Sequence, residues 1–67
     1  MFSADFYVVE ASFSGEKKYF YNRRVWVSSP DFARKFSTKT NAKKTVFAAG
    51  ITEFSVLKYI NGGYLYC

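Results

Sequence analysis

Histidine is absent from the chain, and cysteine occurs once, as the last residue, Cys67. Histidine is the commonest protein ligand for metals and the side chain that most easily moves protons near neutral pH. A single cysteine cannot form an intramolecular disulfide or a thiolate-rich metal site, which is typical of a protein from a reducing compartment. We therefore expect no metal, no other cofactor and no disulfide framework.

Carboxylates are scarce as well, with five Asp and Glu residues scattered along the chain. No glycine-rich phosphate loop precedes a helix, and the Ser-His and Cys-His arrangements of nucleophilic catalysis both need histidine. Asp5 and Glu53 would meet if their strands were neighbours, but such a pair is more often a solvated edge than an acid/base couple. The sequence therefore predicts a protein that is not an enzyme.

Long apolar runs are missing too. No window approaches the roughly 20 apolar residues of a membrane span, and the opening MFSADFYVVEASF lacks the basic start of a secretory signal. We expect a soluble protein of the cytoplasm, with no membrane partner. A chain of 67 residues buries only about 60% of its unfolded surface, so we expect a single domain, residues 1–67.

Aromatic residues, in contrast, are abundant: eight Phe, six Tyr and one Trp. They bury a large area for few rotatable bonds, and so make a compact core plausible for a short chain. Residues 5–13 alternate at period two and predict a strand. The turn residues Ser14 and Gly15 then predict a hairpin with the strand that follows. Its alternation breaks at residues 22–24, so residues 17–27 are either one bent strand or two short ones.

A helix is predicted after residues 28–31, which end the sheet because Pro30 donates no ladder hydrogen bond. Thr38 can cap its first N–H groups and Gly50 is favoured just beyond a helix end, which places the helix over residues 39–49. Its expected buried stripe lies at Ala42, Val46 and Ala49.

Two more strands are expected after the helix. They are residues 51–60 and residues 64–67, joined by Asn61-Gly62, the strongest short hairpin signal in the chain. The expected fold class is α+β: an antiparallel sheet of four to five strands with one helix packed on one face, in ββαββ order. One helix covers only one face, so we expect the other face to be wetted or covered in part by a partner.

The charge of the chain is +5 and uneven. Nine of the ten cations lie in residues 17–44, where Asp31 is the one carboxylate. Such a field attracts nucleic acid or an acidic protein surface, although it also keeps a small protein soluble without any partner. The candidate partner-binding residues are the cations of this window and two of its rings: Lys17, Lys18, Phe20, Arg23, Arg24, Trp26, Arg34, Lys35, Lys39, Lys43 and Lys44.

The stretch KKYFYNRRVWV, residues 17–27, has two interpretations. Its rings and cations could stack bases and neutralise phosphates, as in proteins that bind single strands. Alternatively, the rings belong to the core of a small sheet and the cations form its solvated rim, which we favour because rings fill most small β cores. The position of Phe20 and Trp26, beneath the helix or on the bare face, distinguishes the two.

A resemblance bears on the choice of function. Tyr19-Phe20-Tyr21, Trp26, the run ARKFST over residues 33–38 and Ala42-Lys43-Lys44 together resemble very small phage-encoded accessory proteins of the anti-CRISPR or host-takeover type. The resemblance implies a stoichiometric inhibitor, acting in the host cytoplasm, that occupies a host protein or nucleoprotein complex. A basic chain would have to engage an acidic surface or a nucleic-acid complex.

Two functions follow as expectations. The first is a non-catalytic small binding protein that occupies an acidic protein surface or a nucleoprotein complex. The alternative is a small basic nucleic-acid-binding protein. A second copy of the chain is a further candidate partner, because an exposed edge strand at residues 64–67 can pair with its own kind.

Overall fold

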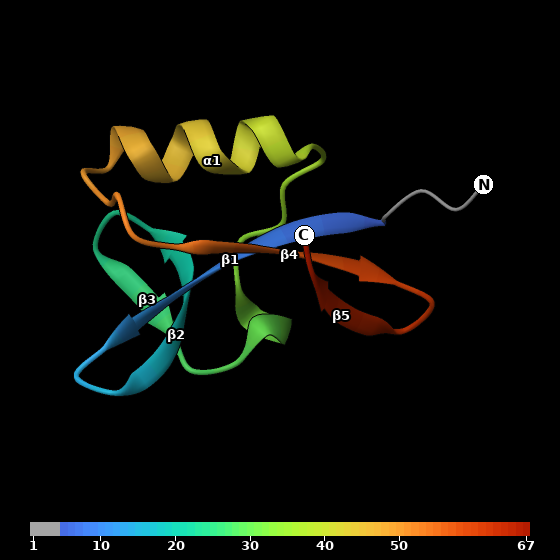
Figure 1. The fold of residues 1–67 in the computed structure, drawn as a ribbon, viewed down its shortest axis with the longest axis horizontal. Helices are drawn as coiled ribbons and strands as arrows, with labels where there is room; N and C mark the ends of the chain where they lie inside the picture. The colour runs from blue at the N-terminus through green and yellow to red at the C-terminus, as the bar shows by residue number, and fades with distance from the viewer. Residues whose placement is uncertain (1–4) are drawn as a thin grey trace.

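A five-stranded antiparallel sheet forms the frame of the protein (Figure 1). The structure is a computed structural model that describes residues 5–67. The expectation that the chain does not open with a secretory signal falls partly on residues 1–4, outside this range. Neighbouring strands run in the order β3-β2-β1-β4-β5. Their bounds are β1 Phe6–Phe13, β2 Glu16–Asn22, β3 Val25–Val27, β4 Ser55–Ile60 and β5 Gly63–Tyr66. With the single α-helix described below, this confirms the α+β class.

Two tight turns fix two of the strand pairings in the sheet. Ser14 and Gly15 both have positive φ, 53° and 83°, and so do Asn61 and Gly62, 52° and 78°. Two consecutive residues in the left-handed region are typical of the two-residue turn whose twist matches that of a hairpin. The turn chemistry expected at both positions therefore produces the β1–β2 and β4–β5 hairpins.

The element order differs from the expected ββαββ, because three strands precede the helix. The Asn22 side chain accepts hydrogen bonds from the backbone N–H groups of Arg24 and Val25, both at 2.8 Å. This side-chain turn replaces ladder bonds and shifts the register between Phe20 and Asn22. Of the two alternatives for residues 17–27, the structure has two short strands.

Helix α1, Lys39–Ala48, begins where its cap predicts. The Thr38 hydroxyl accepts a hydrogen bond from the N–H of Asn41 at 3.1 Å, and Gly50 follows the helix with φ of 90°. Ala42 and Val46 are fully buried against the sheet. The helix packs on β1 and β4. Among residues 5–67, no helix is long and apolar enough to cross a membrane.

The chain passes through the sheet on its way to the helix. After the short 3₁₀ helix η1, Pro30–Phe32, the chain enters between β1 and β2: Tyr7 and Phe36 exchange two backbone hydrogen bonds of 2.8 Å. The N–H of Arg34 donates to the carbonyl of Phe20 on β2 at 2.9 Å. We call residues 33–36 the crossing segment. Figure 1 shows it leading from η1 on one side of the sheet to α1 on the other.

Each face of the sheet has its own core because of this crossing. The helix side buries Val9, Phe20, Phe36, Ala42, Val46 and Val56. The opposite side buries Ala33, the first residue of the crossing segment, against Val8 and Leu57. The face without the helix is therefore covered in part by the chain itself, which the sequence did not indicate.

Phe32, the last residue of η1, is 72% exposed. One local expectation is corrected. The strand expected over residues 51–60 begins only at Ser55. Ile51 and Phe54 pack instead against the helix-side core as part of the loop after α1.

Candidate functional site

The two rings named as candidate contacts lie on the helix side of the sheet. Phe20 is 1% exposed, and Trp26 is half-buried with its ring edge-on to Phe20 at a centroid distance of 5.4 Å. Phe13, which is 42% exposed, packs edge-on against Trp26 at 4.9 Å. Phe20 is a core side chain and Trp26 packs against the same core, so these two rings do not form an exposed stacking platform.

Three cations nevertheless converge beside that core. A hollow of ≈ 460 Å³ lies between the turn after β2 and the second half of α1. We call it the basic hollow. It is lined by Phe20, Asn22, Arg23, Arg34, Lys44, Thr45, Ala48 and Ala49.

A different element positions each cation of the hollow. Arg23 follows Asn22 in the side-chain turn described above, which fixes its backbone. Arg34 lies on the crossing segment, with its guanidinium 5.5 Å from the centre of the Phe36 ring. Lys44 is an exposed residue of α1. Residues 23, 34 and 44 are distant in the sequence, and the crossing of the sheet brings them together.

Positive charge in the hollow is not neutralised by the chain. No carboxylate lines it, and within residues 5–67 the ion pairs are those of Lys17 with Glu10, at 4.0 Å, and Lys18 with Glu16, at 3.8 Å. Like charges around one concave surface raise the local potential and favour binding of an anionic group. The arrangement can therefore hold a carboxylate or a phosphate against a partly apolar wall.

The remaining candidate residues lie elsewhere. Lys35 lies on the other side of the sheet, with Nζ 5.2 Å from the centre of the Phe6 ring and 3.4 Å from the carbonyl oxygen of Asp31. Arg24 is exposed in the turn without lining the hollow. The others are found on β2, β3 and the first half of α1: Lys17, Lys18, Trp26, Lys39 and Lys43. Of the eleven candidates, the hollow gathers Phe20, Arg23, Arg34 and Lys44.

The sequence did not lead us to the apolar residues that line or border the basic hollow. Ala48 and Ala49 line the basic hollow, and Phe47, which is 65% exposed, borders a second, more open hollow of ≈ 600 Å³ with Lys43, Lys44 and Phe54. Residues 44, 47 and 48 share one face of a helix by their spacing. That spacing was the available signal, because it places Phe47 one helical turn after Lys43 and Lys44.

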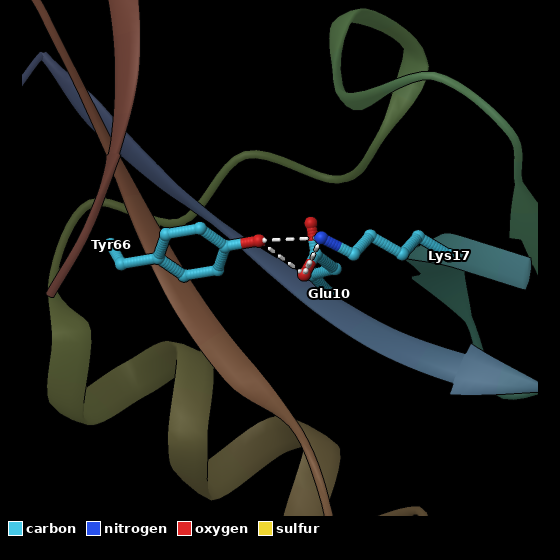
Figure 2. Close-up of polar contacts among 3 residues, drawn as sticks. All are labelled: Glu10, Lys17 and Tyr66. Atoms are coloured by element: carbon cyan, nitrogen blue, oxygen red, sulfur yellow. Dashed lines mark hydrogen bonds and ion pairs between the residues drawn. The ribbon is translucent and has the colours of Figure 1, made fainter. Parts of the chain in front are cut away.

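A polar network lies on the opposite face of the sheet (Figure 2). Glu10 is only 7% exposed, and its Oε1 accepts a hydrogen bond of 2.8 Å from the Tyr66 hydroxyl. Lys17 Nζ donates to the same hydroxyl at 3.2 Å. The hydrogen bond to Tyr66, with the nearby Glu10 carboxylate, raises the pKa of Lys17. Burial, then Glu10, raises the pKa of Tyr19.

This network stabilises the fold. It joins β1, β2 and β5, and no buried side-chain nitrogen or oxygen within the described residues lacks a hydrogen-bond partner. A second bond of the same kind holds η1 to β5, since the Tyr64 hydroxyl donates to Asp31 Oδ1 at 3.0 Å. Burial and this bond raise the pKa of Tyr64 to about 12. In residues 5–67, no group of three or more Cys, Asp or Glu side chains is arranged to hold a metal ion.

Known proteins offer no guide to the site. No protein-family model matches the chain, and searches of curated proteins and of solved structures give no significant match.

Proposed function

We propose that this protein is a non-catalytic binding protein that occupies an acidic surface of a partner protein or nucleoprotein complex through the basic hollow. One observation carries the proposal: Arg23, Arg34 and Lys44 converge on a single hollow with no carboxylate in its lining. An acidic partner would relieve the repulsion among these cations and gain from their field during encounter.

Nucleic-acid binding is the second candidate. The cations of residues 17–44 that lie outside the hollow, such as Arg24, Lys39 and Lys43, extend the positive surface in a way that suits a phosphate backbone. Phe20 is buried and Trp26 is half-buried against it, which weighs against base stacking on this surface, and base stacking supplies much of the affinity of single-strand binders. We therefore place the acidic protein surface first.

We propose a stoichiometric mode of action. A small domain that blocks a partner by occupying its surface needs no reaction chemistry, and tight binding is then sufficient for inhibition. The resemblance to small phage proteins is the reason for the proposed target, a host protein or nucleoprotein complex. It is also the reason for the proposed site of action, the host cytoplasm.

Charge reversal tests the proposal. We expect the double variant Arg23→Glu/Arg34→Glu to lose at least tenfold in affinity for a partner captured from host lysate and then purified, as measured by titration calorimetry. The control is Lys58→Glu, which reverses one charge on β4, outside the hollow, and therefore matches the single variant Arg23→Glu in net charge. It should bind within about twofold of the wild type.

Equal affinity of the double variant and the wild type for the purified partner would contradict the proposal. A gel shift with single- and double-stranded DNA separates the second candidate. Retention that weakens with a log-log salt slope of about 0.7–0.9 per neutralised phosphate would favour nucleic-acid binding.

A further inference from the structure

We infer that the basic hollow is a socket for one apolar side chain, aromatic or aliphatic, carried by an acidic segment of the partner protein. The inference rests on the proposed function and deepens it by naming the chemistry of the bound group. The cations alone would suffice to bind an acidic surface. The hollow also has free volume and an apolar wall, and these suit an apolar side chain.

The wall formed by the helix includes two small side chains. Ala48 and Ala49 line the hollow together with the buried ring of Phe20. Small residues leave free volume where larger ones would fill it. A cavity of about 150 Å³ suffices to bind benzene, so ≈ 460 Å³ has room for a Phe or Leu side chain and the start of its backbone.

Arg34 gives the socket an aromatic preference. The carbon of its guanidinium lies 5.5 Å from the centre of the Phe36 ring, and the same side chain lines the hollow. Arg is the cation most often found over aromatic faces, on which its planar guanidinium stacks. A ring entering the hollow would come within reach of this guanidinium, so we expect Phe or Tyr to bind more tightly than Leu.

The cations at the edge of the hollow then favour carboxylates next to the bound aromatic ring. Arg23 lies in the turn after β2 and Lys44 on the helix, so cations from two different elements border the apolar wall. An extended segment with acidic residues flanking one aromatic residue matches this order of charge and apolar surface.

A second copy of the chain does not offer such an acidic segment. Phe32 is the most exposed large apolar side chain among residues 5–67, at 72%, and it follows the acidic Asp31. It is also followed by Arg34 and Lys35, and the Asp31 carboxylate already accepts a hydrogen bond from Tyr64. Insertion of Phe32 would bring cations against cations, so charge complementarity favours a different, acidic chain.

Labelled peptides test the socket by fluorescence anisotropy with the full chain at low salt. The probes are Glu-Glu-Phe-Glu-Glu, Glu-Glu-Ala-Glu-Glu and a single-stranded DNA of matched charge. We expect the Phe peptide to bind the wild type about tenfold more tightly than the Ala peptide, a difference of 1.4 kcal/mol. Ala48→Trp should fill the hollow and remove this difference.

Two controls secure the interpretation. Thr40→Trp adds the same side chain to α1 outside the basic hollow and should keep the tenfold preference. Ala48→Leu serves if Ala48→Trp fails to fold by circular dichroism, with a smaller loss of the preference expected.

Equal affinity for the Phe and Ala peptides in the wild type would overturn the socket, and their salt-sensitive binding would then still support the acidic partner. Absence of binding to either peptide would also overturn it, and the proposed function would stand if the purified partner still discriminates Arg23→Glu/Arg34→Glu. Tighter binding of the DNA than of both peptides would overturn the socket and favour the nucleic-acid candidate.

Discussion

Asn22 is an uncharged residue that shapes the positively charged hollow. Its side-chain oxygen accepts hydrogen bonds from two backbone N–H groups and so fixes the turn that places Arg23 at the basic hollow. Asn is suited to this role because its short side chain can replace a backbone acceptor. The sequence indicated a break in strand alternation here, and the break is the feature that separates β2 from β3.

Tyr66 has a comparable structural role on the other face, and its hydroxyl can be removed with little change of shape. Tyr66→Phe takes the short hydrogen bond away from the buried Glu10 carboxylate. Hydrogen bonds to charged groups contribute about 1.5–3 kcal/mol, and the exposed position of Tyr66 favours the lower part of this range. We expect the free energy of unfolding, measured in urea, to fall by about 1–2 kcal/mol.

The control for Tyr66→Phe is Tyr21→Phe. Tyr21 is 49% exposed, and its hydroxyl has no hydrogen-bond partner among residues 5–67. Its loss should change stability by less than about 0.5 kcal/mol. If the two variants lost equal stability, the network around Glu10 would contribute nothing specific.

Among the elements, those set by local signals were predicted well. The start of α1 follows from the hydroxyl of Thr38, and both hairpins follow from their turn dipeptides. The crossing segment could not be predicted, because Tyr7 and Phe36 are far apart in the sequence and a pairing of two single residues leaves no periodic pattern. Since Arg34 belongs to this segment, the site could not be assembled from sequence either.

The cap of α1 gives the prediction at this scale. Thr38→Ala removes the acceptor for the N–H of Asn41, and loss of such a cap costs about 1 kcal/mol of stability. We expect a fall of this size in the free energy of unfolding. Thr40→Ala, within the same helix but outside the cap, should change stability by less than about 0.5 kcal/mol. A loss as large for Thr40→Ala as for Thr38→Ala would contradict the role of the cap.

For the molecule as a whole, the sequence predicted which stretch of the chain is rich in positive charge. It did not predict how these cations divide between the two faces of the sheet. Lys35 and Lys17 lie on the face opposite α1, whereas Arg23, Arg34 and Lys44 gather beside the helix. Residues that are close in sequence, such as Arg34 and Lys35, end on different sides because the chain crosses the sheet between them. A window of basic residues therefore becomes two surfaces, and the one beside the helix carries the basic hollow.

The most direct test locates the bound group on the whole molecule. Amide chemical shifts of the isotope-labelled protein would be followed by NMR during titration with Glu-Glu-Phe-Glu-Glu. The basic hollow predicts the largest changes at Arg23, Arg34 and residues 44–49, with little change on the face that carries Glu10 and Tyr66. Changes centred on Lys17, Tyr19 and Tyr66 would contradict the assignment of the binding surface to the hollow.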